Sequence, residues 1–303
     1  MPSSGRRWVA ALALIAATGC GRNSSPPSNP SPQPTPQPQL PAQLTGVLVG
    51  AGDIAVCNSP GAESTARLLD ASEGTVFTAG DNAYFQGSAS QYSQCYEPTW
   101  GRHRDRTRPT PGNHEYETAG ASAYFNYFGE NAGPGGLGFY SFEVGNWHVV
   151  SLNSNTLASE GSAQIQWLRQ DLSSTRARCV AAIWHHPLFS SGQNGGVPFM
   201  RDAWRTLREM GADVVIQGHD HIYERFARQD ENGRATSDGL RGFVVGTGGA
   251  ELTNMGRLAA NSESRMSKVF GVLKLTLRSD SYTWQFIAVP PATFTDIGSD
   301  SCR

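Results

Sequence analysis

The stretch Gly80-Asp81-Asn82-Ala83-Tyr84 follows the apolar, β-branched run Thr75-Val76-Phe77-Thr78-Ala79, and together they indicate the fold. The run is typical of a buried strand. Gly80 turns the backbone at the end of that strand and leaves the carboxylate of Asp81 there, with two oxygens that can bridge two metal ions. Tyr84 can bring a phenol oxygen to the same place. Gly-Asp is also ordinary turn chemistry, so its meaning depends on the other strand ends.

Four further stretches place polar side chains after extended or apolar runs. They are Gly52-Asp53 after Val47–Ala51, Gly112-Asn113-His114-Glu115 after a proline-rich segment, His185-His186 after Val180–Trp184, and Gly218-His219-Asp220-His221 after Ala212–Gln217. Adjacent histidines on an extended chain point in opposite directions, whereas histidines at i and i+2 share a face. One site can therefore use one histidine of the first pair and both His219 and His221.

Helical patterns separate these strands, which favours an α/β layered fold with the polar groups at the carboxyl ends of strands. Residues 62–69, 163–172 and 199–210 have helical character, and Gly145-Asn146 is typical of a hairpin turn. The last two predicted strands, 269–277 and 282–288, are expected to pair antiparallel. His148, within the hairpin, and Trp167 are interpreted as structural residues.

The composition does not favour a highly charged partner. The chain has 303 residues and a formal net charge of −2, so bulk charge gives no reason to expect nucleic-acid or membrane-surface binding.

The N-terminus predicts export. Residues 1–20 combine Arg6 and Arg7 with a short apolar core and a small-residue approach to Cys20, which resembles a bacterial lipoprotein signal with Cys20 lipidated; an ordinary signal peptide is the alternative. Residues 21–44 form a Pro/Ser-rich linker, which is either a tether or a tail without function. Residues 45–303 are the predicted catalytic domain. The expected location is the cell envelope, or the medium if no lipid is attached.

Four further cysteines in an exported chain predict disulfides. Three pairings are possible. We favour Cys57 with Cys95, since both follow strand-end loops expected on one face, which leaves Cys179 with Cys302.

The order of these motifs resembles the calcineurin-like metallophosphoesterases, over about residues 45–225. Many members carry Asp-x-His as the first motif, but here Ala55 stands at the histidine position and Tyr84 supplies a phenol. This substitution is similar to the purple acid phosphatase branch. The resemblance, with the repeated strand ends, implies a four-layer αββα sandwich of two mixed sheets.

The resemblance implies two metal ions with one shared ligand. The first would be held by Asp53, Asp81, Tyr84 and His221, and the second by Asp81, Asn113, His185 and His219. Carboxylate and phenolate suit Fe(3+), whereas imidazoles and an amide suit a divalent ion such as Zn, Fe or Mn.

The expected reaction is hydrolysis of small phosphate monoesters by in-line attack of a metal-bound hydroxide. His114 is free to touch phosphate or to protonate the leaving alcohol. Related enzymes place a second substrate-facing histidine where this chain has Asn194, which can donate a hydrogen bond but no proton; His186 either compensates or is structural. The alternatives are a phosphodiesterase or nucleotidase on the same metal core, and a non-catalytic metal- or ligand-binding lipoprotein.

Overall fold

The computed structural model describes residues 44–303, so the predicted signal peptide and nearly all of the linker lie outside the described residues. Within this range the strands form two sheets, in which the strand orders are β13-β12-β11-β1-β2-β3 and β10-β8-β9-β7-β6-β5-β4. The six-stranded sheet contains β1 (Leu44–Ala51), β2 (Thr75–Thr78), β3 (Thr107–Arg108), β11 (Gly271–Arg278), β12 (Ser281–Ala288) and β13 (Ile297–Ser301). The seven-stranded sheet contains β4 (Tyr140–Val144), β5 (Trp147–Ser151), β6 (Cys179–Ile183), β7 (Val214–Gln217), β8 (Tyr223–Phe226), β9 (Arg241–Val245) and β10 (Ser262–Met266).

Both sheets are mixed. In the first, β1, β2 and β3 run parallel, and the strands from β11 to β13 are antiparallel to their neighbours. In the second, β5, β6, β7 and β9 run parallel, while β4, β8 and β10 pair antiparallel at the two sides. The parallel strands therefore bring their carboxyl ends to one edge of each sheet.

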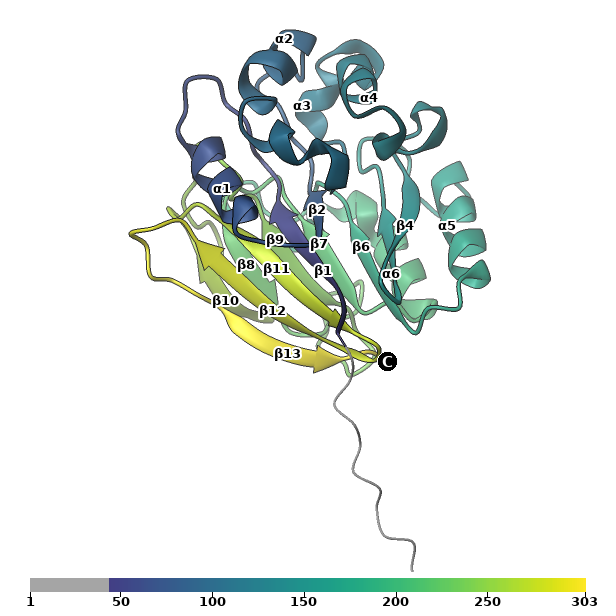
Figure 1. Cartoon of the computed structure of the whole chain (residues 1–303). Coiled ribbons are helices and arrows are strands. Elements are labelled where there is room, and N and C mark those ends of the chain that lie inside the picture. The colour runs from purple at the N-terminus through teal and green to yellow at the C-terminus, as the bar shows by residue number, and fades with distance from the viewer. Residues whose placement is uncertain (1–43) are drawn as a thin grey trace, which may run out of the picture. The chain divides into compact units, whose positions relative to one another are not determined.

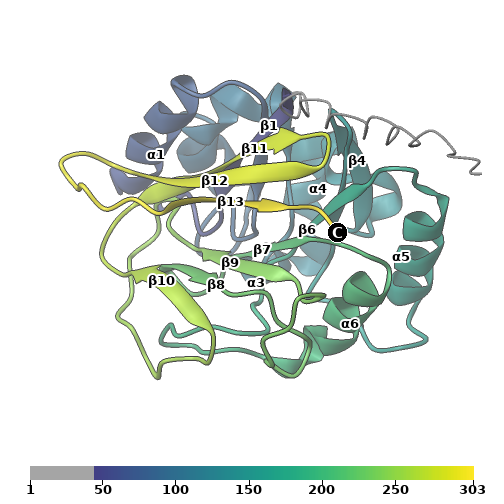
Figure 2. The ribbon, with the colours of Figure 1, turned by 90° about the horizontal axis from the view of Figure 1, so that it is seen from below.

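Helices cover the outer face of each sheet, as the views in Figure 1 and Figure 2 show. α1 and the short helices that follow β2 lie on the six-stranded sheet, and α5 and α6 lie on the seven-stranded sheet. The result is the expected four-layer αββα sandwich. The α-helices are α1 (Gly61–Asp70), α2 (Ala89–Gln91), α3 (Asn113–Tyr116), α4 (Ser122–Phe128), α5 (Ala163–Ser174) and α6 (Arg201–Glu209).

The apolar run in β6 shows how the layers pack. Ala181 and Ile183 are buried in the core between the sheets, whereas Val180 and Ala182 are buried with Trp204 beneath α5 and α6. A strand with both faces covered has no reason to alternate, so its sequence is continuously apolar.

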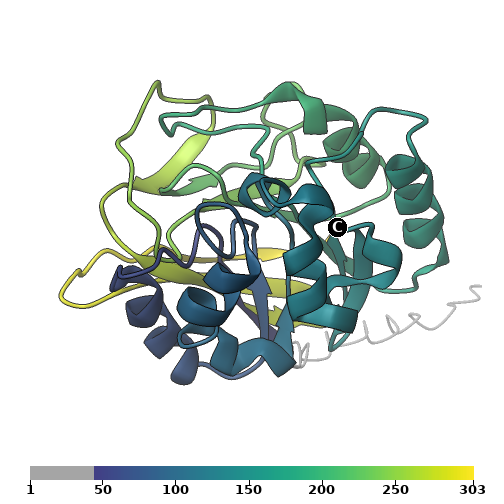
Figure 3. The ribbon, with the colours of Figure 1, turned by 90° about the horizontal axis from the view of Figure 1, so that it is seen from above.

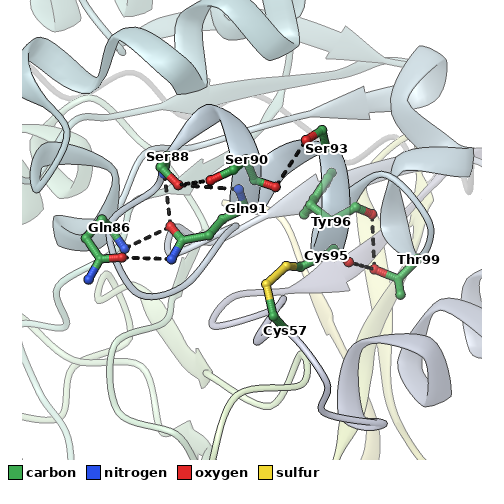
Figure 4. The surroundings of a disulfide bond; sticks show 9 residues. All are labelled: Cys57, Gln86, Ser88, Ser90, Gln91, Ser93, Cys95, Tyr96 and Thr99. Atoms are coloured by element: carbon green, nitrogen blue, oxygen red, sulfur yellow. Dashed lines mark hydrogen bonds between the residues drawn. A yellow bond between two sulfur atoms is a disulfide. The ribbon is translucent and has the colours of Figure 1, made fainter.

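Two disulfides tie distant segments to this sandwich, and both match the predicted pairing. Cys57 and Cys95 join the loop after β1 to a helical turn after α2 (Figure 4). Cys179 and Cys302 join the start of β6 to the C-terminal tail.

The predicted elements are present with small shifts in their bounds, but several short ones were not predicted. β3 has two residues, and β13 reads Ile-Gly-Ser-Asp-Ser at the outer side of its sheet, so neither carries an apolar pattern. β8, β10 and the helices α2–α4 were also missed. No helix within residues 44–303 is long and apolar enough to cross a membrane.

Candidate metal centre

The loops that follow the parallel strands meet on one face of the domain, which Figure 3 views from above. Every residue predicted to bind metal comes from such a loop or, for Asn113, from the first position of α3. The structure brings all of them together, in two groups that share Asp81.

The first group contains two carboxylates, a phenol and an imidazole. The hydroxyl of Tyr84 lies 2.9 Å from Asp53 Oδ1, 3.0 Å from Asp81 Oδ2 and 3.1 Å from His221 Nε2. His221 Nε2 lies 3.1 Å from Asp53 Oδ1. Four polar atoms from three loops, those after β1, β2 and β7, thus face one point.

The second group contains two imidazoles and an amide. Asn113 Oδ1 lies 3.0 Å from His185 Nε2 and 3.1 Å from His219 Nδ1, and these two ring nitrogens are 3.2 Å apart. His185 Nε2 also lies 3.1 Å from Asp81 Oδ2. One atom, Asp81 Oδ2, therefore belongs to both groups.

The backbone is held in unusual conformations to achieve this arrangement. Asp53, Asp81 and His219 have φ angles of 60°, 51° and 69°, in the left-handed region that side chains other than glycine rarely adopt. Such conformations persist only where the surrounding structure fixes them, and they cluster at functional sites.

Two glycines allow the loops to approach. A Cβ on Gly80, where φ is 85°, would lie 2.4 Å from His185 Nδ1. A Cβ on Gly112 would lie 2.1 Å from Asp81 Oδ1. Glycine is therefore required at both positions for steric reasons.

The carboxylate of Glu115 joins the two loops that carry Asp81 and Asn113. It is fully buried. It accepts hydrogen bonds from four backbone N–H groups and one phenol, those of Asp81 (3.0 Å), Gly112 (2.6 Å), Asn82 (2.8 Å), Ala83 (3.4 Å) and Tyr92 (3.1 Å). Burial, with the charge of Asp81, raises the pKa of Glu115. No role was predicted for Glu115, although it closes the Gly-Asn-His-Glu motif.

Asp220 fixes the loop that contains Asn194. Its carboxylate accepts the backbone N–H of Asn194 at 2.9 Å and the hydroxyl of Ser190. The amide of Asn194 in turn donates to the carbonyl of His219 at 3.3 Å. Asn194 is thus exposed at the rim of the second group rather than inside it.

Burial and neighbouring opposite charges shift the pKa values of the clustered side chains. Burial disfavours the ionised carboxyl of Asp81, but His185 and His114 outweigh it and hold its pKa below the usual range. Burial alone would lower the pKa values of His185 and His221, yet the carboxylates beside them raise both to about 9. Burial, with the carboxylates, also raises the pKa of Tyr84. A cation bound here would displace these protons.

His114 and His186 lie on different sides of this cluster. His114 Nδ1 lies 2.5 Å from the carbonyl oxygen of Phe85, and its Nε2 lies 3.8 Å from Asp81 Oδ2. His186 Nδ1 bonds to the Ser154 hydroxyl at 2.8 Å, and burial lowers the pKa of His186 to about 2. The lowered pKa disfavours the protonated form that His186 would need as a proton donor.

His148 has the structural role expected of it. Its Nδ1 lies 2.7 Å from Glu143 Oε1, and its Nε2 lies 2.7 Å from Asp171 Oδ2. It joins β4, β5 and α5 far from the strand-end cluster.

A cavity of about 740 Å³ opens beside the first group. Its lining includes Tyr84, His114 and His221, together with residues 250–254 after β9. The cavity is within the size range of small-molecule sites.

A two-sheet sandwich whose strand ends carry two donor sets around one carboxylate defines the binuclear metallophosphoesterase class. The chain belongs to the family described as Calcineurin-like phosphoesterase, whose model matches residues 50–223.

Its curated relatives include purple acid phosphatases of Arabidopsis thaliana. Purple acid phosphatase 18 is 31% identical over 154 residues, which cover 46% of this chain and 35% of that protein. Purple acid phosphatase 21 is 31% identical over 183 residues, which cover 52% of this chain and 41% of that protein. The chain thus spans less than half the length of either relative.

A solved structure with the same fold is the purple acid phosphatase PPD1 from yellow lupin seeds. It superposes with a TM-score of 0.74 at 20% identity, over 85% of this chain and 54% of that one. The fold also occurs in GAP50, named as the anchor in the inner membrane complex of Plasmodium, with a TM-score of 0.65 at 14% identity over 84% of this chain and 88% of that one. Fold alone therefore leaves the activity open.

Proposed function

We propose that this chain is an exported phosphatase that hydrolyses small phosphate monoesters with two metal ions. The observation that carries the proposal is the position of Asp81 Oδ2, 3.0 Å from the Tyr84 hydroxyl and 3.1 Å from His185 Nε2. A carboxylate oxygen shared by two complete donor sets is what a bridging ligand requires. The family and the purple acid phosphatase relatives support the same reading.

The donor sets fit two different ions. Asp53, Asp81, Tyr84 and His221 would hold Fe(3+), because carboxylates and a phenolate are hard anionic ligands. Asp81, Asn113, His185 and His219 would hold a divalent Zn, Fe or Mn ion, because imidazoles and a neutral amide suit such ions.

Hydrogen bonds from two of the histidines to backbone carbonyls support this assignment. His185 Nδ1 lies 2.8 Å from the carbonyl of Ala79, and His221 Nδ1 lies 2.5 Å from the carbonyl of Glu251. These bonds place the proton on Nδ1 of each ring and leave Nε2 free toward the cluster.

Two bound ions would polarise the phosphoryl group and activate water as the nucleophile. The chain itself supplies proton transfer and orientation. His114 holds one proton on Nδ1 against the carbonyl of Phe85 and turns Nε2 toward the cluster, so a protonated Nε2 can give its proton to the leaving alcohol. Asn194 would donate its second amide hydrogen, the one not directed at the His219 carbonyl, to a phosphate oxygen.

Export agrees with the cysteine chemistry. Two disulfides within residues 44–303 suit an oxidising compartment. The lipid anchor proposed on Cys20 lies outside the described residues. The mass of the N-terminal peptide of the mature protein tests it, with a lipidated Cys20 as the expected result and cleavage elsewhere as the contrary one.

The experiment for the function is an assay with matched substrates. Purified protein of known metal content is tested against 4-nitrophenyl phosphate and bis(4-nitrophenyl) phosphate across pH, beside Asp81→Asn. We expect two metal ions per chain, preference for the monoester, and loss of both metal and activity in the variant. Preference for the diester would indicate a phosphodiesterase, and metal without turnover would indicate a binding protein; either result overturns the proposal.

A further inference from the structure

The cavity beside the first donor set has an aromatic wall that the proposed reaction does not use. Phe85 lines this cavity and is 58% exposed, although it is a large apolar side chain directly after Tyr84. Val56 and Leu252 also line the cavity. An exposed phenylalanine in a cleft beside a reaction centre indicates a surface that a ligand covers.

The ring of Phe85 is close enough to the centre to meet the part of a substrate next to its phosphate. Its centroid lies 5.7 Å from the ring of Tyr84, whose hydroxyl faces the donor atoms, and 6.3 Å from the ring of His114. Both contacts are edge-type, so neither ring stacks in parallel on Phe85. The group closest to Phe85 would be the leaving alcohol, because His114 is the proposed donor to it.

The backbone under Phe85 is fixed. The carbonyl of Phe85 meets His114 Nδ1, and the side chain amides of Gln86 and Gln91 bond to each other at 2.8 Å. Gln91 also accepts the backbone N–H groups of Gln86 and Ser88, each at 3.0 Å. Figure 4 shows this ladder beside the Cys57–Cys95 disulfide. The backbone that carries the ring is therefore held in place before a ligand arrives, which reduces the entropy lost on binding.

The polar residues Thr253 and Lys268 also line this cavity. Thr253 Oγ1 is buried and makes no hydrogen bond to any described residue. Lys268 bonds to the carbonyl of Leu252 at 3.0 Å, and it forms no ion pair within residues 44–303. A planar ring with polar substituents would pack on Phe85 and bond to Lys268 in the same cavity.

We propose that Phe85 binds the leaving group and selects phosphate monoesters whose alcohol carries a planar aromatic ring. Nucleoside monophosphates and aryl phosphates share this chemistry. The inference rests on the proposed phosphatase function. The cavity of about 740 Å³ is large enough for either alcohol.

The test compares two matched substrate pairs in the metal-loaded wild type and in Phe85→Ala. Adenosine 5′-monophosphate is compared with ribose 5-phosphate, and O-phosphotyrosine with O-phosphoserine. For each pair, kcat/KM of the ring-bearing substrate is divided by kcat/KM of its partner. This ratio in the wild type is then divided by the same ratio in Phe85→Ala. The resulting quotient does not depend on the intrinsic reactivity of the substrates. Stacking of a ring on an aromatic side chain predicts that at least one such quotient is about 5 to 150. The pair that responds identifies the source of the ring.

Binding provides a second measurement that does not depend on turnover. Isothermal titration of the loaded protein with the non-hydrolysable phosphonate analogue of adenosine 5′-monophosphate, and with an arylmethylphosphonate, should show a Kd weakened about fivefold or more in Phe85→Ala for the responding ring. Phe85→Tyr should keep both the selectivity and the affinity.

Ile297→Ala is the control, since Ile297 is 65% exposed on β13, away from the cavity. It should leave both quotients at one. Quotients near one in Phe85→Ala, with unchanged Kd values, would overturn the inference while ribose 5-phosphate hydrolysis keeps the phosphatase function intact. Absence of metal-dependent hydrolysis of all four substrates by the wild type would instead overturn the proposed function, and the inference with it.

Discussion

Replacement of Glu115 by Gln tests the organisation of the metal centre without touching any proposed ligand. Glu115 Oε2 accepts the N–H groups of Asp81 and Gly112, and Oε1 accepts those of Asn82 and Ala83. A glutamine has one oxygen and one NH₂ group. Whichever way its amide turns, two backbone donors face another donor.

The magnitude follows from this count. A buried donor left without an acceptor costs about 1–3 kcal/mol, so two of them predict a loss of about 2–6 kcal/mol in the free energy of unfolding. That loss is a large fraction of the total stability of a typical domain, which is about 5–15 kcal/mol.

The assay is urea unfolding of the metal-free protein, with disulfides intact, followed by tryptophan fluorescence. Metal-free protein is used because bound ions would add their own stabilisation. Metal content after dialysis is the second measurement, and we expect Glu115→Gln to retain less metal because the backbone of Asp81 loses its anchor.

Glu117→Gln is the matched control. Glu117 is exposed two residues further along the chain, so the change should stay within about 0.5 kcal/mol. If Glu115→Gln also unfolds within about 0.5 kcal/mol of the wild type and retains its metal, Glu115 does not organise these loops and the reasoning fails.

Three other predictions test separate parts of the molecule. Tyr84→Phe removes only the oxygen, so an iron-loaded wild type should show a visible charge-transfer band that the variant lacks; colour that persists would contradict the Tyr84 assignment. Loss of the Cys179–Cys302 bridge in a double serine variant should destabilise the fold by about 5 kcal/mol in the chain-entropy model, because the cysteines are separated by 123 residues; unchanged urea unfolding would contradict it. Burial alone would lower the pKa of His148, but its two carboxylate partners raise it, so its contribution is fully present below the unfolded pKa of about 6.5 and is lost as pH rises through the higher folded value. The stability difference between the wild type and His148→Gln should therefore shrink from pH 6 upward, and a difference independent of pH would refute that.

The sequence predicts much of the site because chemistry and backbone geometry coincide there. Asp53, Asp81 and His219 each follow a glycine at the end of an apolar run, and the structure brings all three into one cluster in left-handed conformations. Parallel strands align their carboxyl ends, so a polar residue after each strand is directed to a common edge. The pairing of Cys57 with Cys95 was predicted in the same way, because both cysteines follow strand-end loops on one face of the domain.

Other features could not be read from the pattern. Glu115 and Asp220 act through hydrogen bonds to distant loops. Glu115 binds the backbone of Asn82, 33 residues away in the chain, and Asp220 binds that of Asn194, 26 residues away. Nothing local marks a carboxylate that accepts backbone N–H groups from a distant loop. The exposure of Phe85 was not predicted either, because no periodic pattern in this loop indicates which side chains face the cavity.

The short strands were missed for a related reason. β3 has only Thr107 and Arg108, and its pairing with β2 depends on a neighbour brought there by the fold. Periodicity needs several residues before it can indicate an element.

The most direct test of the central claim is an anomalous difference map from crystals of the protein as purified, recorded above the zinc absorption edge, where iron, manganese and zinc all scatter. We predict two peaks on either side of Asp81 Oδ2. One should lie within bonding distance of Asp53, Tyr84 and His221, and the other within bonding distance of Asn113, His185 and His219. A single peak, or peaks that do not share Asp81, would contradict the binuclear centre on which the proposed phosphatase function depends.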